Sequence, residues 1–204
     1  MIERLGSDIR SILIKPSDFF PSIKNAGLPL AYQHYTLLLI FFAVLAGIVR
    51  MIGNSMKMMD FMMAFPVYGP IIVQKICPLF TEFGLLLALG TFLIGLYLVF
   101  ILGGLLHAFV LLAGGEEGIF QTIKVLMYAA TPAFLIGWIP VVGIIGFLWS
   151  LFITVHGLKE CAGLSYLRSI MVVVVPIALL VLFLVLLLGL IASLTKVLNP
   201  LYWM

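Results

Sequence analysis

Five long apolar segments run along the chain, and few charged residues interrupt them. They cover residues 35–52, 83–113, 119–137, 141–156 and 170–194. A helix needs about 20 apolar residues to cross the hydrocarbon core of a bilayer. The segments are continuous rather than alternating, so they predict helices and not the strands of a barrel. The sequence therefore predicts an all-α integral membrane protein with five transmembrane helices.

An N-terminal amphipathic interfacial helix is predicted ahead of these segments. Within residues 1–14, apolar side chains recur at helical spacing and the charged ones lie elsewhere on the wheel. Such a helix lies on a membrane surface or against a partner, or forms a lid on the protein's own ends. The apolar positions are Ile2, Leu5, Ile9, Ile12 and Leu13.

A proline marks the end of this first helix. Pro16 breaks a helix, and Ser17 or Asp18 can cap a second short one. The rings of Phe19 and Phe20 are suited to the lipid interface.

The first spanning helix is predicted to begin near Tyr32 and Tyr35, whose rings favour the headgroup level, and to end at Arg50. Residues 51–82 then form the longest connection, which is rich in methionine. Because methionine is flexible and polarizable, this connection is expected to be an interfacial helix in lipid or an adaptable contact surface.

Inside the later segments, small residues and prolines predict local features. Gly104 and Ala108 form a pair that lets another helix approach closely. Pro132 should kink the third span and release a carbonyl for Thr131 or a neighbour. The third and fourth spans, separated by residues 138–140, should form a tight hairpin. The fifth should face lipid.

Composition and charge agree with a membrane protein. Of the 204 residues, 64% are hydrophobic and 9% are charged, and the mean hydropathy is +1.30. The net charge of +3 is scattered, so no nucleic-acid surface is indicated. Counting Lys and Arg at the segment ends places the N-terminus in the cytoplasm and the C-terminus outside. The predicted regions are residues 1–32 (cytoplasmic amphipathic segment), 33–196 (five-helix domain) and 197–204 (tail).

Cofactor and metal motifs are absent from the sequence. Cys77 and Cys161 have no CxxC or Cys/His spacing, and we expect neither a disulfide nor a zinc site. His107 and His156, with Glu160 one turn after His156, could form a proton or metal site, but the spacing is not that of a metal motif. Hydrogen bonding between helices is the simpler expectation. We expect no cofactor.

Glu116 and Glu117 follow a pair of glycines expected to end the second span. One class of intramembrane protease uses EExxxR with two histidine motifs, but the arginine position here holds Gln121. The alternative is that both glutamates lie in the first turn of the next helix, where its dipole favours negative charge. Glu117, Gln121 and Lys124 would then share one face, with Lys124 reaching the interface.

Aromatic, glycine and proline landmarks recur along the chain. They are Lys15, Pro16, Phe20, Gly114, Gly115, Phe120, Thr122, Val125, Tyr128, Pro132, Trp138, Ile139, Pro140, Gly143, Trp149, Gly157, Leu158, Arg168 and Pro176.

In this order the landmarks resemble the Yip family of Ypt/Rab-interacting proteins, in its bacterial and archaeal form. The resemblance implies a five-helix membrane protein with a cytoplasmic N-terminus. Eukaryotic members are linked to small GTPases and vesicle traffic, so a small GTPase is a partner by family analogy alone. This sequence departs from those members because its Tyr68, Gly69, Pro70 triplet follows the first spanning helix.

The expected function is a non-enzymatic scaffold or adaptor in a prokaryotic cell membrane. Its partners would be the lipid bilayer and either a second copy or another membrane protein, contacted through Gly104 and Ala108. The alternative is a small-solute or ion transporter or channel, with a polar path near His107 lined also by Gln121, Thr131 and His156. An enzyme is not indicated, since no nucleophile motif or phosphate loop occurs.

Overall fold

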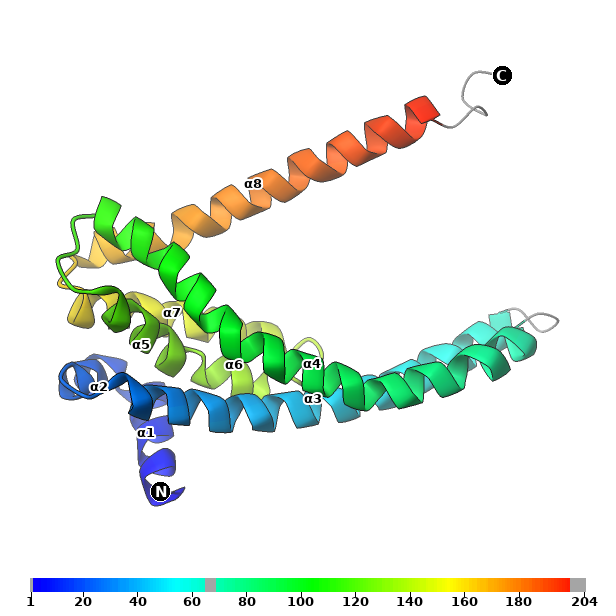
Figure 1. Cartoon of the computed structure of the whole chain (residues 1–204), viewed down its shortest axis with the longest axis horizontal. Coiled ribbons are helices and arrows are strands. Elements are labelled where there is room, and N and C mark those ends of the chain that lie inside the picture. Colours follow the sequence, from blue (N-terminus) through cyan, green and yellow to red (C-terminus); the bar gives the residue numbers. More distant parts are fainter. Residues whose placement is uncertain (1, 65–68, 199–204) are drawn as a thin grey trace.

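Helices make up the structure. The computed structural model describes residues 2–64 and 69–198, and side chains there except at 2–3, 50–85, 87, 192 and 194–198. None of the described residues is in a strand. The helices are α1 (Ile2–Ile14), α2 (Pro16–Ile23), α3 (Leu28–Ala64), α4 (Gly69–Leu112), α5 (Ile119–Ala129), α6 (Thr131–Ile136), α7 (Gly143–Cys161) and α8 (Tyr166–Leu198), shown in Figure 1.

Five stretches are long and apolar enough to cross a membrane, which confirms the predicted fold class. They are Leu28–Val49, Ala88–Leu112, Ile119–Ile136, Gly143–Cys161 and Tyr166–Ile191. The third span comprises α5 and α6 together, and the hairpin it forms with α7 packs against α3 and α4. α8 contacts α7 and α4 and then diverges from the bundle (Figure 1), so residues 177–191 are exposed as expected for a lipid-facing helix.

The first two spanning helices are longer than the sequence predicts. α3 does not end at Arg50 but continues to Ala64, and α4 already begins at Gly69. The predicted connection over residues 51–82 is therefore largely helical. Its methionine side chains and Cys77 lie outside the described side chains, and Tyr68 lies outside the described residues, so the contact surface expected there stays a prediction.

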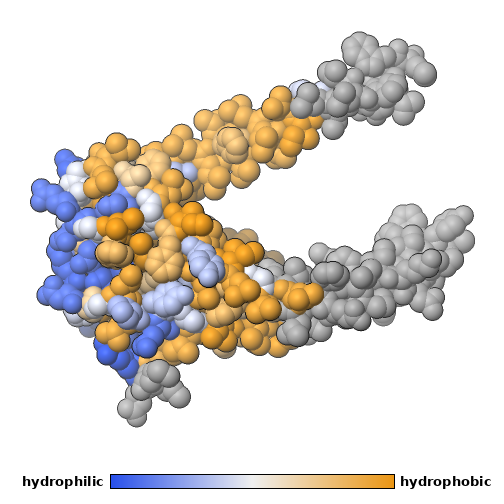
Figure 2. Space-filling model, in the orientation of Figure 1, coloured by the Kyte–Doolittle hydropathy of each residue, from blue (hydrophilic) through white to orange (hydrophobic). Residues whose placement is uncertain are grey.

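Among the residues that are coloured in Figure 2, the hydrophilic ones gather at one end of the molecule. This polar end consists of α1, α2, the loop at 113–118 between α4 and α5, and the turn at 162–165 between α7 and α8. α1 has the predicted bounds and lies across the direction of the long helices (Figure 1). Ile12 is fully buried whereas Ile14 is 65% exposed, so α1 packs on the bundle and also presents an apolar residue outward.

α2 inserts aromatic side chains into the core. Phe19 and Phe20 are buried, so placing them at the lipid interface was wrong. Phe20 packs so tightly on α7 that a Cβ at Gly157 would lie 2.8 Å from its Cζ. The expected cap was also wrong, because Pro16 occupies the first turn of α2 and no side chain caps it.

Tyr35 is another core residue rather than a headgroup anchor. It is buried, and its hydroxyl donates a hydrogen bond of 2.8 Å to the carbonyl of Gly95 on α4. A buried phenol needs such a partner. Tyr35 therefore ties α3 to α4, and its predicted interfacial position was wrong.

The kink predicted at Pro132 is confirmed as the break between α5 and α6. Pro132 has no N–H to donate to the carbonyl of Tyr128, four residues earlier. The hydroxyl of Thr131 donates to that carbonyl instead, at 2.6 Å. On the other side of the break, the N–H of Ala133 donates to the hydroxyl of Ser150 on α7, at 3.1 Å. Side chains thus satisfy the backbone groups that the kink exposes.

Candidate functional site

Lys124 on α5 makes several hydrogen bonds to the polar end. It is only 4% exposed. Its ammonium donates hydrogen bonds to three backbone carbonyls, those of Ile23 (3.1 Å), Lys24 (2.8 Å) and Ala26 (2.8 Å). The last carbonyls of a helix have no intrahelical partner, and a cation there also suits the helix dipole. Lys124 therefore caps the C-terminus of α2 from a helix about 100 residues away.

Gln121 adds to this cap one turn earlier on α5. Its side-chain amide donates a hydrogen bond of 3.0 Å to the carbonyl of Lys24. Its carbonyl oxygen is buried and has no hydrogen-bond partner within the part of the chain that the structure describes. Together, Gln121 and Lys124 hold the start of the chain on the bundle, and we call this contact the α2 clasp.

Glu117 contributes an ion pair at the edge of the clasp. Its carboxylate lies 2.8 Å from the ammonium of Lys24, with both side chains about a third exposed. The hydrogen bond and the negative charge of Glu117 raise the pKa of Lys24. Exposed pairs of this kind contribute little to stability, so Glu117 orients the loop more than it holds the fold.

Three predictions about this corner were wrong. Glu116 and Glu117 are not in the first turn of a helix, because α5 begins at Ile119 after Gly118. Glu117 pairs with Lys24 rather than with Lys124. Lys124 does not reach toward the interface, because carbonyls near the end of α2 enclose its ammonium.

The glycine pair does end α4 as expected. Gly114 has a φ of +82°, a conformation that residues with a Cβ rarely adopt. The N–H of Gly115 then donates to the carbonyl of Val110 at 2.9 Å. This bond closes the helix end and turns the chain toward α5.

His107 and His156 lie in separate surroundings. His107 shares a hydrogen bond of 3.0 Å with Thr122, which links α4 to α5. The Nδ1 of His156 lies 3.0 Å from the carbonyl of Phe152, and its ring lies 4.2 Å from that of Phe152. Glu160 pairs with neighbouring Lys159 at 2.8 Å. Within the described part of the chain, no three His, Cys, Asp or Glu side chains gather as metal ligands would.

The small-residue pair on α4 faces outward. A Cβ at the adjacent Gly103 would lie 2.5 Å from Ile123, so Gly103 makes the close contact with α5. A Cβ at Gly104 would meet only Ile119, at 4.0 Å, and Ala108 is exposed. Gly104 and Ala108 therefore remain open to a helix from outside the bundle.

His34 on α3 is the polar core residue that the sequence analysis missed. It is 4% exposed, and its Nε2 lies 3.0 Å from the hydroxyl of Thr131. Its ring centroid lies 5.0 Å from that of Tyr128. No local motif links residues 34 and 131, and only the general need of a buried imidazole for a partner could have drawn attention to His34.

The arrangement positions segments rather than assembling reactive groups at one point. The four residues considered for a polar path do not meet. Gln121 belongs to the α2 clasp, and Thr131 bonds His34 and the carbonyl freed at the kink. His107 bonds Thr122, and His156 bonds the carbonyl of Phe152. Gln121, Thr131 and His107 each hold one element to another, whereas His156 bonds within α7. In hydrocarbon, such bonds form because the alternative is an unsatisfied polar group.

Comparison with known proteins identifies the family. Residues 10–188 match the family model described as the Yip1 domain. No curated protein and no solved structure gave a significant match. The matched range includes α2 to α7 and most of α8, which confirms the resemblance seen in the sequence. The chain is thus a multi-pass integral membrane protein that belongs to the Yip1 domain family.

Proposed function

We propose that this protein is a non-enzymatic membrane scaffold or adaptor. The observation that carries the proposal is the α2 clasp, in which Lys124 and Gln121 fasten the start of the chain to the bundle. The clasp makes α1, α2 and the loop at 113–118 one preassembled surface. A partner that binds this surface meets it already ordered, which lowers the entropic cost of association.

The proposed orientation places this surface in the cytoplasm. The positive-inside rule supports it, because positively charged residues concentrate near the polar end. The C-terminus, after five spans, then lies outside. The positively charged residues assigned to the inner side are Arg4, Arg10, Lys15, Lys24, Lys124, Lys159 and Arg168.

Within the membrane, the proposed contact surface is the outward stripe of α4 around Gly104 and Ala108. Ile101 is 66% exposed, Leu105 56% and Leu112 84%, so apolar side chains flank the small pair. Small residues allow the backbone of a second helix to approach closely. A second copy of the chain or another membrane protein would pack here.

Cross-linking in native lipid tests the stripe. We expect Gly104→Leu combined with Ala108→Leu to reduce recovery of cross-linked oligomer or partner, because two added side chains hold the neighbouring helix away. Gly189→Leu is the matched control, because a Cβ at this glycine on exposed α8 meets nothing within 4 Å. Equal recovery from both variants would show that the stripe is not the contact surface.

A flux measurement tests the functional class itself. Proteoliposomes with the wild-type protein should show no solute or ion flux above that of empty vesicles. A pH-dependent flux that disappears in His107→Ala would replace the scaffold with a transporter. His107 is suited to this test because its hydrogen bond to Thr122 lies between α4 and α5, inside the membrane.

A further inference from the structure

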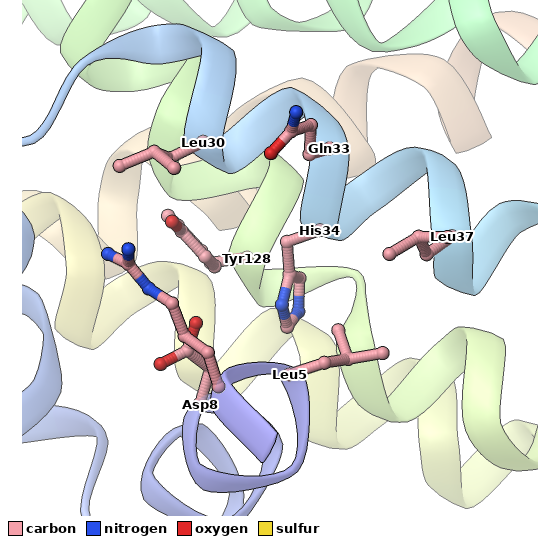
Figure 3. Close-up of a pocket in the computed structure, with 8 residues that line it drawn as sticks. Leu5, Asp8, Leu30, Gln33, His34, Leu37 and Tyr128 are labelled. Carbon is pink, nitrogen blue, oxygen red and sulfur yellow. The ribbon is translucent and has the colours of Figure 1, made fainter. Parts of the chain in front are cut away.

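A half-open pocket lies between α1, the start of α3 and α5. Its volume is about 40 Å³, which is room for a few water-sized groups. Figure 3 shows the ring of His34 in this pocket, between Tyr128 and Leu5, with Asp8 on the helix that faces it. The residues that line the pocket include Arg4, Leu5, Asp8, Leu30, His34 and Tyr128.

One ring nitrogen of His34, Nδ1, takes no part in the contact with Thr131. The hydroxyl of Thr131 has a single hydrogen, which it donates to the carbonyl of Tyr128 at 2.6 Å. It can therefore only accept from His34, whose Nε2 must carry the proton. Nδ1 is then a lone-pair acceptor, and it is buried with no hydrogen-bond partner among the described residues. His34 lines the pocket and Thr131 does not, but Nδ1 itself has no exposed surface, so it is reached from the pocket only when α1 moves outward.

Asp8 is a second acceptor on the opposite wall. It is partly buried, and no hydrogen bond or ion pair of its carboxylate occurs among the described residues. Its charge is opposed only by the exposed Arg4, one turn earlier on α1. Two acceptors, one of them negative, thus face a single small space. Such a space favours a cationic group with more than one N–H, that is, a primary ammonium.

We propose that this pocket binds the ammonium head of an aminophospholipid such as phosphatidylethanolamine, which donates to Nδ1 of His34 and to the carboxylate of Asp8. Arg4 at the pocket then faces the phosphate of the same headgroup. α1 forms one wall of the pocket, and a small outward shift of α1 brings the ammonium to Nδ1.

The place of the pocket favours a lipid over a free amine. His34 lies six residues after the start of the span at Leu28, or about 9 Å at 1.5 Å per residue. The span of 22 residues is about 33 Å long, close to the thickness of the hydrocarbon core, so His34 lies on the acyl-chain side of the headgroup boundary. Leu30, which is 37% exposed, and Leu5 add apolar surface for the upper part of an acyl chain.

Competitive lipid retention tests the proposal. The purified full-length protein is equilibrated with equal amounts of phosphatidylethanolamine and phosphatidylcholine, and the retained lipids are measured by native mass spectrometry. Phosphatidylcholine is the matched probe because its quaternary ammonium has no N–H. We expect about tenfold more phosphatidylethanolamine, the preference that one charge-assisted hydrogen bond provides.

Variants then locate the site. Asp8→Asn should remove most of the preference, and Leu5→Trp should reduce retention by filling the pocket. Asp18→Asn is the control, since Asp18 is exposed on α2 and lies outside the pocket. Asp8 has no partner among the described residues whose loss would unfold the chain. Asp8→Asn therefore tests whether the ammonium binds in this pocket even if Leu5→Trp folds poorly.

Three results would overturn the proposal. Equal retention of the two lipids would show that N–H donors are not recognised. Equal behaviour of Asp8→Asn and Asp18→Asn would place the lipid elsewhere. Displacement of the lipid by soluble phosphoethanolamine at the same concentration would make the occupant a free amine.

Discussion

The ammonium of Lys124 lies 2.8 Å from the backbone carbonyl of Ala26, although 98 residues separate the two in the chain. Ala26 follows α2, and Lys124 lies within the third span. A cation buried among carbonyls is stable only while those carbonyls stay in place. Docking of the N-terminal segment and burial of Lys124 are therefore one event.

Replacing Lys124 should release the N-terminal segment. In Lys124→Met the side chain keeps its length, but three backbone carbonyls lose their charged donor. We expect the free energy of unfolding to fall by about 3 kcal/mol. Trypsin should also cleave faster after Arg10 and Lys24 in the native protein, because α1 and α2 then detach. Unfolding in mixed micelles and limited proteolysis measure the two effects.

Lys159→Met is the control for this change. Lys159 is exposed and, among the described residues, pairs with neighbouring Glu160 alone, so its loss should change stability by less than about 0.5 kcal/mol. Similar losses in the two variants would mean that Lys124 contributes as an ordinary surface charge. The α2 clasp would then not hold the proposed scaffold surface on the bundle.

The spans, the kink and the glycine turn could be predicted because each depends on local sequence. A long apolar run specifies a spanning helix, Pro132 removes one N–H, and Gly114 allows a positive φ. The proline also predicted that Thr131 or a neighbour would bond the freed carbonyl, and the structure shows that Thr131 does. These features need no knowledge of which helices are neighbours.

The clasp and the His34 contact could not be predicted because they join distant residues. A lysine in the second turn of a spanning helix has the same local pattern whether it extends to the interface, as expected for Lys124, or caps another helix. Phe20 likewise suits either the lipid interface or a protein core. It lies in the core because α2 packs against α7 at Gly157. Neighbours in space, rather than residue type, set these outcomes.

Thr131 should contribute more to the free energy of unfolding than an equally buried threonine elsewhere. Thr131→Val keeps the shape but leaves the carbonyl of Tyr128 and the Nε2 proton of His34 unpaired. We expect a loss of about 2 kcal/mol in the free energy of unfolding. Thr154→Val is the control, because its hydroxyl bonds the carbonyl of Ser150 within α7, which the helix itself already satisfies. That control should lose less than about 0.5 kcal/mol, and an equal loss would disprove the role of Thr131 at the kink.

Asp8 should make stability depend on pH. Burial raises the pKa of Asp8 above its ordinary value of 3.8, against the opposing charge of Arg4. The folded protein therefore binds this proton more tightly than the unfolded chain, so the cost of the charged carboxylate is present above the raised pKa and disappears below 3.8.

The comparison of wild type with Asp8→Asn isolates this cost. At neutral pH the variant should unfold at a higher temperature than the wild type. The difference should shrink as the solution is acidified and vanish below pH 3.8, because the wild-type carboxyl is then neutral in both states. Thermal unfolding across this range measures it, and a difference that grows on acidification would contradict the assigned direction.

Two adjacent glycines on α4 should respond oppositely to the same added methyl group. A Cβ at Gly103 would lie 2.5 Å from Cγ1 of Ile123 and 3.3 Å from its Cα, so the backbone of α5 itself limits relief. Gly103→Ala should therefore lower stability by about 1–3 kcal/mol through overpacking. Gly104→Ala meets only Ile119 at 4.0 Å, and alanine favours a helix over glycine by up to about 1 kcal/mol. It should be neutral or stabilising. Unfolding in mixed micelles compares the two, and a destabilised Gly104→Ala beside an unaffected Gly103→Ala would mean that α4 presents a different face to α5.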